Sequence, residues 1–241
     1  MAEKKITFKV LRYKEGDKAP HYDTFTVDCD EDTTVLVALQ NIRRDHDGSL
    51  MLRHSCHHAS CGTCGMKING HEELSCVVKA LDLGTDTVVV EPLDNIPLIS
   101  DLVVDMEAFY ARYTAAGMPY IRRSEFMPEA EPPEGVTAFT RYENCLECGI
   151  CVSACPIAGS SPEYLGPAAL AAAWRVVEEP RGLSIEGPLA WVDQPDGCWR
   201  CHVAFECTEA CPSNVDPAGA IMSLRRELTK RKIRRFFGLK A

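Results

Sequence analysis

The sequence predicts an α+β chain of two domains, and three features of its 241 residues lead to this prediction. The first hundred residues contain short segments in which apolar and polar residues alternate, as in half-buried strands. The remainder carries apolar residues at helical spacing between loops. The chain has thirteen cysteines, and most of them gather in three places. We therefore expect one domain over residues 1–100 and a second, mainly helical domain over residues 101–241.

The composition is that of an acidic, folded protein. Hydrophobic residues make up 46% of the chain, and 26 Lys and Arg stand against 35 Asp and Glu, for a net charge of −9. This balance argues against a general nucleic-acid binder. The sequence contains no apolar signal-peptide core and no run of eighteen apolar residues, so a cytosolic setting is expected. Cysteines in that compartment favour metal or redox chemistry over disulfides.

The first domain is expected to contain strands and one helix. The helix covers Thr33–Asp45, with Asp32 as its N-cap. The Asn69-Gly70 pair is a strong signal for a hairpin turn between two of the strands. The expected strands are Ile6–Tyr13, Tyr22–Asp28, Met66–Ile68, Glu73–Val78 and Thr87–Leu93.

The second domain is expected to be helical and rich in loops. Helices are predicted over Asp101–Ala116, which would end at Gly117, over Gly166–Glu179, and over Pro217–Lys230. Residues 127–135 contain three prolines and three glutamates, which is typical of a linker or an exposed loop. The domain boundary is expected near residue 100, and this Pro/Glu stretch is the rival position.

One group of cysteines has the spacing of a plant-type 2Fe–2S site, Cys-x4-Cys-x2-Cys followed by a fourth cysteine. Two irons bridged by two sulfides need four thiolates around a compact core. Gly62 and Gly65 give the loop the backbone freedom to wrap around that core. The predicted 2Fe–2S ligands are Cys56, Cys61, Cys64 and Cys76.

Two alternatives exist for this first group. A structural zinc ion would need four cysteines, but it normally uses paired Cys-x2-Cys knuckles, and only one such pair is present here. A Rieske-type centre would use two histidines on one iron. His54, His57 and His58 lie nearby, but four cysteines already complete the set, which favours a surface role for these histidines.

A second group has the spacing Cys-x2-Cys-x2-Cys-x3-Cys-Pro, in which the fourth cysteine binds the other cluster of a two-cluster protein. The same register recurs at residues 201–212, with Ala204 standing where the second cysteine would be. Exchange of the fourth cysteines predicts a 4Fe–4S cluster on Cys145, Cys148, Cys151 and Cys211. It leaves three ligands for the other cluster, Cys155, Cys201 and Cys207.

An iron opposite Ala204 would have no thiolate, so the expected occupant of the third site is a 3Fe–4S cluster, which lacks that corner. Cys198 forms a Cys-x2-Cys pair with Cys201 and is the alternative fourth ligand, although it lies on the wrong side of Cys201 for the register. Cys29 has no partner nearby in the sequence and is expected to be a buried or half-buried thiol.

The combination of a plant-type 2Fe–2S pattern with a two-cluster helical part resembles the iron–sulfur subunits of the succinate dehydrogenase and fumarate reductase family. The resemblance covers nearly the whole chain, and the third cluster that lacks a ligand is itself a mark of the family. The stretches that carry it are Ser55–Gly65, Pro97–Met106, Cys145–Pro156, Gly166–Ala169, Cys201-His202 and Cys207–Pro217.

The resemblance implies a β-grasp fold for the first domain and an α-helical ferredoxin fold for the second. It also implies a role in respiratory complex II and the tricarboxylic acid cycle. A separate flavoprotein with FAD would oxidise succinate or reduce fumarate, and this chain would conduct electrons between it and a membrane quinone. No catalytic residue is expected on this chain. The implied location is the cytoplasmic face of the bacterial inner membrane, held there by membrane-anchor subunits.

The quinone end departs from part of the family. Many ubiquinone-using members have a tryptophan five residues after the cysteine that matches Cys155, and here that residue is Ser160. Menaquinone-linked and fumarate-reducing members often lack the tryptophan, which favours menaquinone. The residues expected near the quinone are Pro156, Ser160 and His202, although His202 is equally compatible with a helix-surface or packed position.

The C-terminal segment, residues 225–241, carries eight Lys or Arg and one Glu, together with Ile233, Phe236, Phe237 and Leu239. Such a segment suits an anionic membrane surface or a membrane subunit, and the alternative is a solvated helix end. The direction of electron flow is open, so fumarate reduction is the alternative function. Service to another flavoprotein and a zinc scaffold that carries no electrons are the other competitors.

Overall fold

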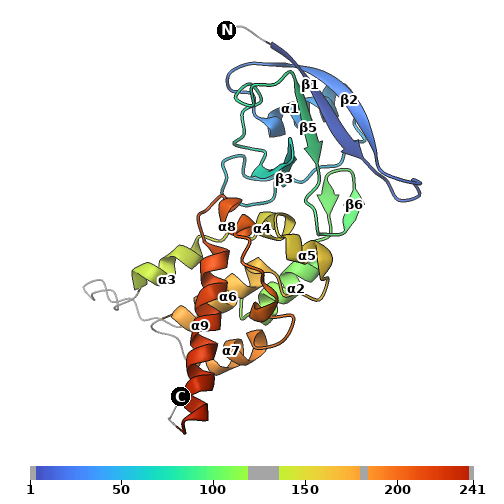
Figure 1. Cartoon of the computed structure of the whole chain (residues 1–241). Coiled ribbons are helices and arrows are strands. Elements are labelled where there is room, and N and C mark those ends of the chain that lie inside the picture. Colours follow the sequence, from blue (N-terminus) through green and yellow to red (C-terminus); the bar gives the residue numbers. More distant parts are fainter. Residues whose placement is uncertain (1–3, 119–135, 180–183, 239–241) are drawn as a thin grey trace. The chain divides into compact units, whose positions relative to one another are not determined.

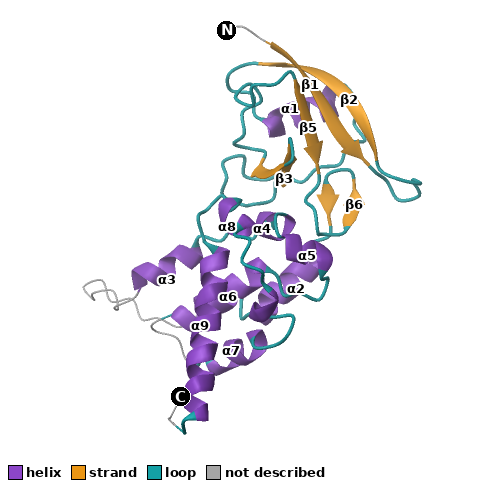
Figure 2. Cartoon of the chain, in the orientation of Figure 1, coloured by secondary structure: helices purple, strands orange, loops and turns teal. Residues whose placement is uncertain are grey.

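The computed structural model of the chain describes residues 4–118, 136–179 and 184–238, and it divides into two compact units. The first unit contains the chain up to Met106 together with Leu146–Ala154, and the second contains Glu107–Cys145 and everything from Cys155 onward. Strands and one longer helix make up most of the first unit, and helices make up the second (Figures 1 and 2). The α+β prediction is confirmed, while the exact boundary at residue 100 stays a prediction. The rival boundary at 127–135 lies outside the described residues.

The first unit is built on a five-stranded mixed sheet with the order β2-β1-β5-β3-β4. β1 pairs with β2 in antiparallel fashion and with β5 in parallel, which is the arrangement expected of a β-grasp sheet. Ile6, Phe8 and Val10 of β1 alternate toward the core and are fully buried. The strands are β1 (Lys4–Arg12), β2 (His21–Cys29), β3 (Gly65–Ile68), β4 (His71–Leu74) and β5 (Thr87–Glu91).

The helix of the first unit, α1 (Val35–Asp45), forms where the apolar spacing predicts it, with Leu36, Leu39 and Ile42 fully buried. The predicted cap is wrong. The hydroxyl of Thr34 accepts a hydrogen bond from the Val37 N–H at 3.2 Å, whereas the Asp32 carboxylate pairs with Lys79. Thr34 is the residue directly before the first helical position, where a side-chain oxygen reaches the third N–H of the helix.

Two element predictions in this unit need correction. β4 ends at Leu74 rather than at Val78, because the chain turns there and the Val77 N–H bonds the Leu74 carbonyl. Residues 101–106 are not helical either. They contain β7 (Val103–Val104), which pairs with β6 (Leu98–Ser100), and the helix α2 (Glu107–Ala115) begins later. α2 ends just before Gly117, as expected.

Asp101 explains why the helix cannot begin at residue 101. Its backbone has a φ of 46° and its side chain is completely buried. The carboxylate accepts hydrogen bonds from the N–H groups of Tyr13 and Met51 at 3.0 and 2.8 Å, and from the guanidinium of Arg12 at 3.1 Å. Asp101 therefore joins β1 to two distant loops of the unit and holds the chain in a non-helical conformation.

Residues 146–154 pack with the first unit through the short helix α4 (Ile150–Ser153). The Ser153 hydroxyl accepts a hydrogen bond from the Asp94 N–H at 2.8 Å and donates one to the Glu72 carboxylate at 3.1 Å. The Asn95 amide donates to the carbonyls of Val152 and Ser153. Part of the second cysteine run is thus held by the loops of the sheet.

The second unit is organised around two packed helices, α6 (Pro167–Glu178) and α9 (Pro217–Phe236). Leu170 and Ala173 of α6 and Ile221 and Leu224 of α9 are fully buried. α9 extends six residues beyond its predicted end at Lys230. The other elements are α2, α3 (Val136–Glu143), α5 (Pro156–Ser160), α7 (Glu186–Val192), the 3-10 turn η1 (Cys198–Arg200) and α8 (Glu206–Glu209).

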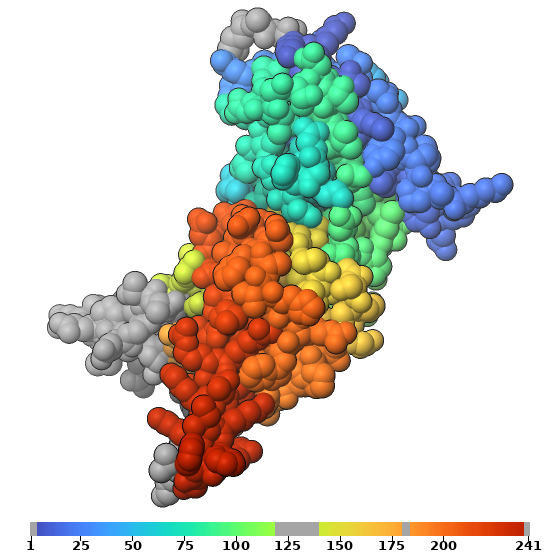
Figure 3. Space-filling model, in the orientation of Figure 1, coloured from blue at the N-terminus to red at the C-terminus, as the bar shows by residue number. Residues whose placement is uncertain are grey.

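The long helix α9 has a clear start. Asp216 caps it by accepting a hydrogen bond from the Gly219 N–H at 3.0 Å, and Pro217 stands in its first turn. Its last turns carry the basic and aromatic residues of the C-terminal segment and lie on the surface of this unit, shown in red in Figure 3. Within the described residues, no helix is both long and apolar enough to span a membrane.

Candidate metal centres

The first cysteine group lies around a loop and the hairpin of β3 and β4. Cys64 comes directly before β3, and Cys76 follows β4 by two residues. Ser75 closes the hairpin beneath them, because its N–H and its hydroxyl both donate to the Cys64 carbonyl at 3.2 and 3.1 Å. The strand pairing therefore fixes Cys64 and Cys76 side by side, and both are buried.

Backbone N–H groups of the same loop point at the cysteine sulfurs. The N–H groups of His58 and Ser60 donate to Cys56 Sγ at 3.5 and 3.3 Å, and the N–H of Ala59 donates to Cys76 Sγ at 3.3 Å. These hydrogen bonds lower the pKa of Cys56 to about 7, because they stabilise the thiolate. Burial raises the pKa of Cys76 to about 11. Such donors also tune the potential of a bound cluster.

The four thiols of this group interact with one another. Cys56 has a side-chain interaction with Cys61, and Cys76 interacts with both Cys64 and Cys56. The structure thus brings together the four cysteines predicted to bind the 2Fe–2S cluster, and the N–H donors around them fit a cluster with thiolate ligands.

The neighbouring histidines make other contacts. The rings of His54 and His57 pack edge to face with their centroids 5.3 Å apart. A ring nitrogen of His58 lies against the Cys56 carbonyl. The side-chain contacts of these histidines are therefore with one another, with Gln40 and with the backbone, as surface residues of the loop would make.

The second cysteine group is divided between the two units. Cys148 and Cys151 belong to the first unit, and Cys145 and Cys211 belong to the second. In the second unit, Cys145 and Cys211 both pack against the same buried cluster of Ala171, Val215 and Ala220. Cys211 Sγ also accepts a hydrogen bond from the Val215 N–H at 3.3 Å. One shared 4Fe–4S cluster on all four cysteines stays a prediction.

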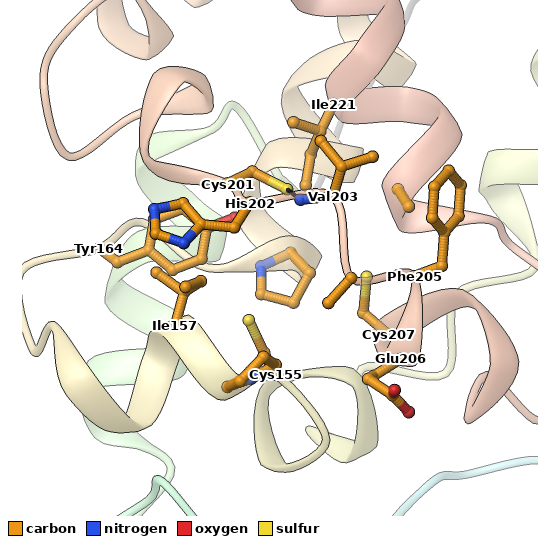
Figure 4. Close-up of a pocket in the computed structure, with 14 residues that line it drawn as sticks. Cys155, Ile157, Tyr164, Cys201, His202, Val203, Phe205, Glu206, Cys207 and Ile221 are labelled. Carbon is orange, nitrogen blue, oxygen red and sulfur yellow. Dashed lines mark hydrogen bonds between the residues drawn. The ribbon is translucent and has the colours of Figure 1, made fainter.

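The third group surrounds a pocket in the second unit (Figure 4). Its three cysteines come from separate segments: Cys155 precedes α5, Cys201 follows η1, and Cys207 lies in α8. The pocket holds about 310 Å³ of space, including some that is open to solvent, and Ala204 is part of its lining. The register of the sequence places Ala204 among these cysteines, and the structure does the same.

The environment of these thiols is apolar. Burial raises the pKa of Cys207 to about 12 and also raises the pKa of Cys155. Thiols in such a pocket stay protonated unless a cation is bound, and bound metal deprotonates its thiol ligands outright. The N–H of Val203 donates to Cys201 Sγ at 3.3 Å, which gives this cysteine the same kind of support as Cys56. The donor set fits an iron–sulfur cluster.

Tyr164 is a member of this pocket that the sequence motifs do not single out. Its side chain is 2% exposed, and its hydroxyl is hydrogen-bonded to the Cys201 side chain. Burial and the three nearby thiols raise the pKa of Tyr164, so that it stays a protonated donor. Its position two residues before Gly166 in the sequence gives no signal of this contact.

Of the remaining residues that the sequence singles out, some line the pocket of the third group and others do not. Pro156 and His202 line the pocket of the third group. The Ser160 hydroxyl donates back to the carbonyls of Pro156 and Ile157, both at 3.2 Å, so it serves its own helix. Cys198 is fully buried in η1 and does not line the pocket, and Cys29 is fully buried in β2.

A single metal ion would need a different arrangement. Within the described parts of the chain, no three His, Cys, Asp or Glu side chains are placed to hold one ion. In an iron–sulfur cluster, different thiolates bind different irons, and the sulfides bridge those irons. The cysteines therefore need only surround the cluster and need not converge on one ion.

Two families of domains match the chain. A 2Fe-2S iron-sulfur cluster binding domain matches residues 7–111, and a 4Fe-4S dicluster domain matches residues 141–215. The first match covers the cysteines of the first group. The second match covers the run from Cys145 through Cys211.

Curated relatives match over almost the full length. The chain is 37% identical to the fumarate reductase iron-sulfur subunit of Escherichia coli O6:H1, over 95% of this chain and 96% of the relative. It is 36% identical to the fumarate reductase iron-sulfur subunit of Mycobacterium tuberculosis, over 90% of both chains. It is also 36% identical to the succinate dehydrogenase iron-sulfur subunit of Coxiella burnetii, over 92% of this chain and 97% of the relative.

A solved structure has the same fold. A chain of the Mycobacterium smegmatis Sdh1 complex in the apo form superposes with a TM-score of 0.84, over 96% of this chain and 98% of that chain, at 22% identity. This solved structure therefore supports the β-grasp and helical-ferredoxin fold that the sequence predicts.

Proposed function

Because the chain belongs to the family of iron–sulfur subunits of succinate dehydrogenases and fumarate reductases, we propose that it is the electron-transfer subunit of a succinate:quinone oxidoreductase. A separate flavoprotein with FAD oxidises succinate. This chain binds the clusters that conduct the electrons, orients them, and carries no catalytic residue for the dicarboxylate.

The proposed ligands follow the three cysteine groups. Each cluster, when bound, supplies one-electron redox chemistry, and the chain supplies thiolates, hydrogen bonds and exclusion of water. The 2Fe–2S cluster is held by Cys56, Cys61, Cys64 and Cys76, the 4Fe–4S cluster by Cys145, Cys148, Cys151 and Cys211, and the 3Fe–4S cluster by Cys155, Cys201 and Cys207.

One observation carries the proposal furthest, namely the pocket that is lined by three buried or half-buried cysteines and by Ala204. It supports a cluster with one corner missing, which separates this subunit from an ordinary two-cluster ferredoxin. The Ala204→Cys variant provides the test. We expect the oxidised 3Fe–4S signal in EPR to be lost and the iron content to rise, because a fourth thiolate completes a 4Fe–4S site.

The outcomes of this test separate the alternatives. A variant that keeps the 3Fe–4S signal and gains no iron would show that Ala204 is not the missing corner. The zinc alternative is tested on the unaltered protein: near-stoichiometric zinc without acid-labile sulfide or an EPR signal would overturn the whole cluster assignment. Ala204→Val, which adds bulk but no thiolate at the same position, is a control that should leave the cluster type unchanged.

We propose menaquinone as the electron acceptor. Ser160 stands where many ubiquinone-using relatives have tryptophan, and its hydroxyl is turned toward its own helix. Pro156 and His202 line the pocket of the third group and are the residues proposed to lie near the quinone. Extraction of the intact membrane complex and identification of its bound quinone tests this; ubiquinone alone would contradict it.

Fumarate reduction is the second candidate function, favoured by the two relatives that are named fumarate reductase subunits. The same chain would then conduct electrons from quinol to the flavoprotein. The comparison of succinate:quinone and quinol:fumarate rates of the purified complex distinguishes the two directions. Service to another flavoprotein is the third possibility, and the flavoprotein that co-purifies with the chain decides it.

The C-terminal end supports a location at the membrane. Among the described residues, Phe236 is 83% exposed and Phe237 is 68% exposed, and their rings pack edge to face. Eight Lys and Arg lie between residues 225 and 241. We place the subunit at the cytoplasmic face of a bacterial inner membrane, held by anchor subunits, with this end toward the membrane.

A further inference from the structure

Gly62 lies where the loop of the first cysteine group meets the segment of the second. Its backbone has a φ of 69°, and a Cβ atom added there would lie 2.5 Å from the Leu146 carbonyl oxygen and 2.8 Å from the Cβ of Cys148. Real Cβ atoms do not approach other atoms so closely. The two loops therefore touch, main chain against main chain, at a position where only glycine fits.

The contact continues at Gly65. A Cβ atom there would lie 3.3 Å from both the Cys148 carbonyl oxygen and a side-chain carbon of Ile150. Gly65 has no positive φ, so the added atom would cost space and little backbone strain. Two glycines that flank Cys64 thus face the same short segment, which includes Cys148.

The segment that they face is fixed to the first unit. Residues 146–154 pack within that unit, and the hydrogen bonds of Ser153 and Asn95 attach α4 to the loops of the sheet. The loop of the first group and half of the second group, Cys148 and Cys151, are therefore held within one unit by a connected set of contacts.

We propose that Gly62 is a positioning residue that sets the distance between the 2Fe–2S and 4Fe–4S clusters, through the contact of its bare main chain with Cys148. This rests on the proposed function. One electron passes between the two clusters, so that one is oxidised as the other is reduced, and no bond is made or broken. The rate of such a step falls steeply with distance, and the absence of a side chain at residue 62 keeps the two ligand loops in contact.

Three glycine-to-alanine variants of the intact complex test this proposal. Gly62→Ala adds both strain at positive φ and a severe clash. Gly65→Ala adds a mild clash. Gly84→Ala is the matched control, because Gly84 has a φ of 65° but nothing within 4 Å of an added Cβ. The comparison of Gly62→Ala with Gly84→Ala thus separates the effect of the clash from the effect of backbone strain at positive φ.

The readouts are the EPR signal of the reduced 2Fe–2S cluster and its spin relaxation, which is enhanced by a nearby reduced 4Fe–4S cluster. We expect the g-values and the iron content of Gly62→Ala to stay close to wild type while the relaxation enhancement is largely lost. The rate at which the 4Fe–4S cluster is reduced from the flavoprotein side should fall several-fold. Gly65→Ala should show a smaller loss of both, and Gly84→Ala none.

The failure of this inference can be told apart from the failure of the proposed function. If wild type lacks the cluster signals, the function itself is wrong. If wild type has them and Gly62→Ala retains full relaxation enhancement and the full rate, the positioning role is wrong. Should Gly62→Ala fail to assemble its clusters, the relaxation enhancement and the rate of the milder Gly65→Ala are compared with those of Gly84→Ala. Equal values in these two variants would then contradict the positioning role.

Discussion

The Tyr164 hydroxyl should raise the reduction potential of the cluster in the third group. Reduction adds negative charge to a cluster, and a hydrogen bond to a ligand sulfur stabilises that charge. Tyr164 is buried and donates to the Cys201 sulfur. The perturbation is Tyr164→Phe, which removes the hydroxyl and keeps the ring that fills the pocket wall.

The expected size follows from the energy of one hydrogen bond. A net contribution of about 0.5 to 1.5 kcal/mol in favour of the reduced form corresponds to about 20 to 65 mV for one electron. The burial of Tyr164 places the effect toward the upper part of this range, since water cannot replace the missing donor. We therefore expect Tyr164→Phe to lower the midpoint potential by about 50 mV.

The assay is an EPR-monitored redox titration of the oxidised 3Fe–4S signal in the intact complex. Tyr110→Phe is the control, because Tyr110 lies in α2 with 46% of its surface exposed and does not line the pocket. An unchanged or higher potential in Tyr164→Phe, with an unaltered line shape, would refute the reasoning. A change in Tyr110→Phe would show that the titration reports general damage.

Three further predictions concern stability and the membrane. Asp101→Ala should lower the free energy of unfolding of the first unit in urea by about 3 to 5 kcal/mol, because Arg12 and two N–H groups lose a buried acceptor. The control Asp86→Ala removes an exposed carboxylate and should cost less than about 1 kcal/mol. Equal losses in the two variants would contradict a special role for the buried carboxylate. The hydrogen bond from Arg12 holds the pKa of Asp47 well below its ordinary value, so this ion pair stabilises the fold above about pH 4 and the effect is lost as the pH falls. Asp47→Asn should therefore flatten the acid limb of the stability profile, and an unchanged limb would argue against it. Replacement of Phe236 and Phe237 by Ser should weaken co-sedimentation with vesicles that contain anionic phosphatidylglycerol by about tenfold. Ile99→Ser, which changes an exposed apolar residue of the first unit, should have no effect; equal loss in both would exclude a specific membrane contact.

Much of the chemistry was readable from spacing alone. The distances between cysteines along the chain predict three cluster sites, and the absence of a cysteine at Ala204 predicts that one of them is incomplete. This works because a cluster demands a fixed number of thiolates from a short loop, so the requirement appears directly in the local sequence. Local patterns also predict β1, β2, α1, α6 and the start of α9.

Long-range contacts decided what local patterns could not. Asp101 looks like the first residue of a helix, but its buried carboxylate is used by Tyr13 and Met51, which are remote in the sequence. The hydroxyl of Tyr164 acquires its role only because the fold brings it to Cys201. The hydrophobic periodicity of the sequence does not predict such contacts, since they depend on which surfaces meet after the helices and strands have formed.

The cysteine pattern by itself therefore predicts the kind of cofactors and the number of their ligands, because metal-cluster ligation is a property of short segments, and the matches to a 2Fe-2S and a 4Fe-4S dicluster domain confirm the first part of this prediction. Only the tertiary structure decided how the ligand segments are held. It placed residues 146–154 with the sheet rather than with the helices that follow them in the sequence, and it set Gly62 against Cys148. That assignment arises from packing and hydrogen bonds between residues 57 to 86 positions apart, which the order of residues along the chain does not encode locally.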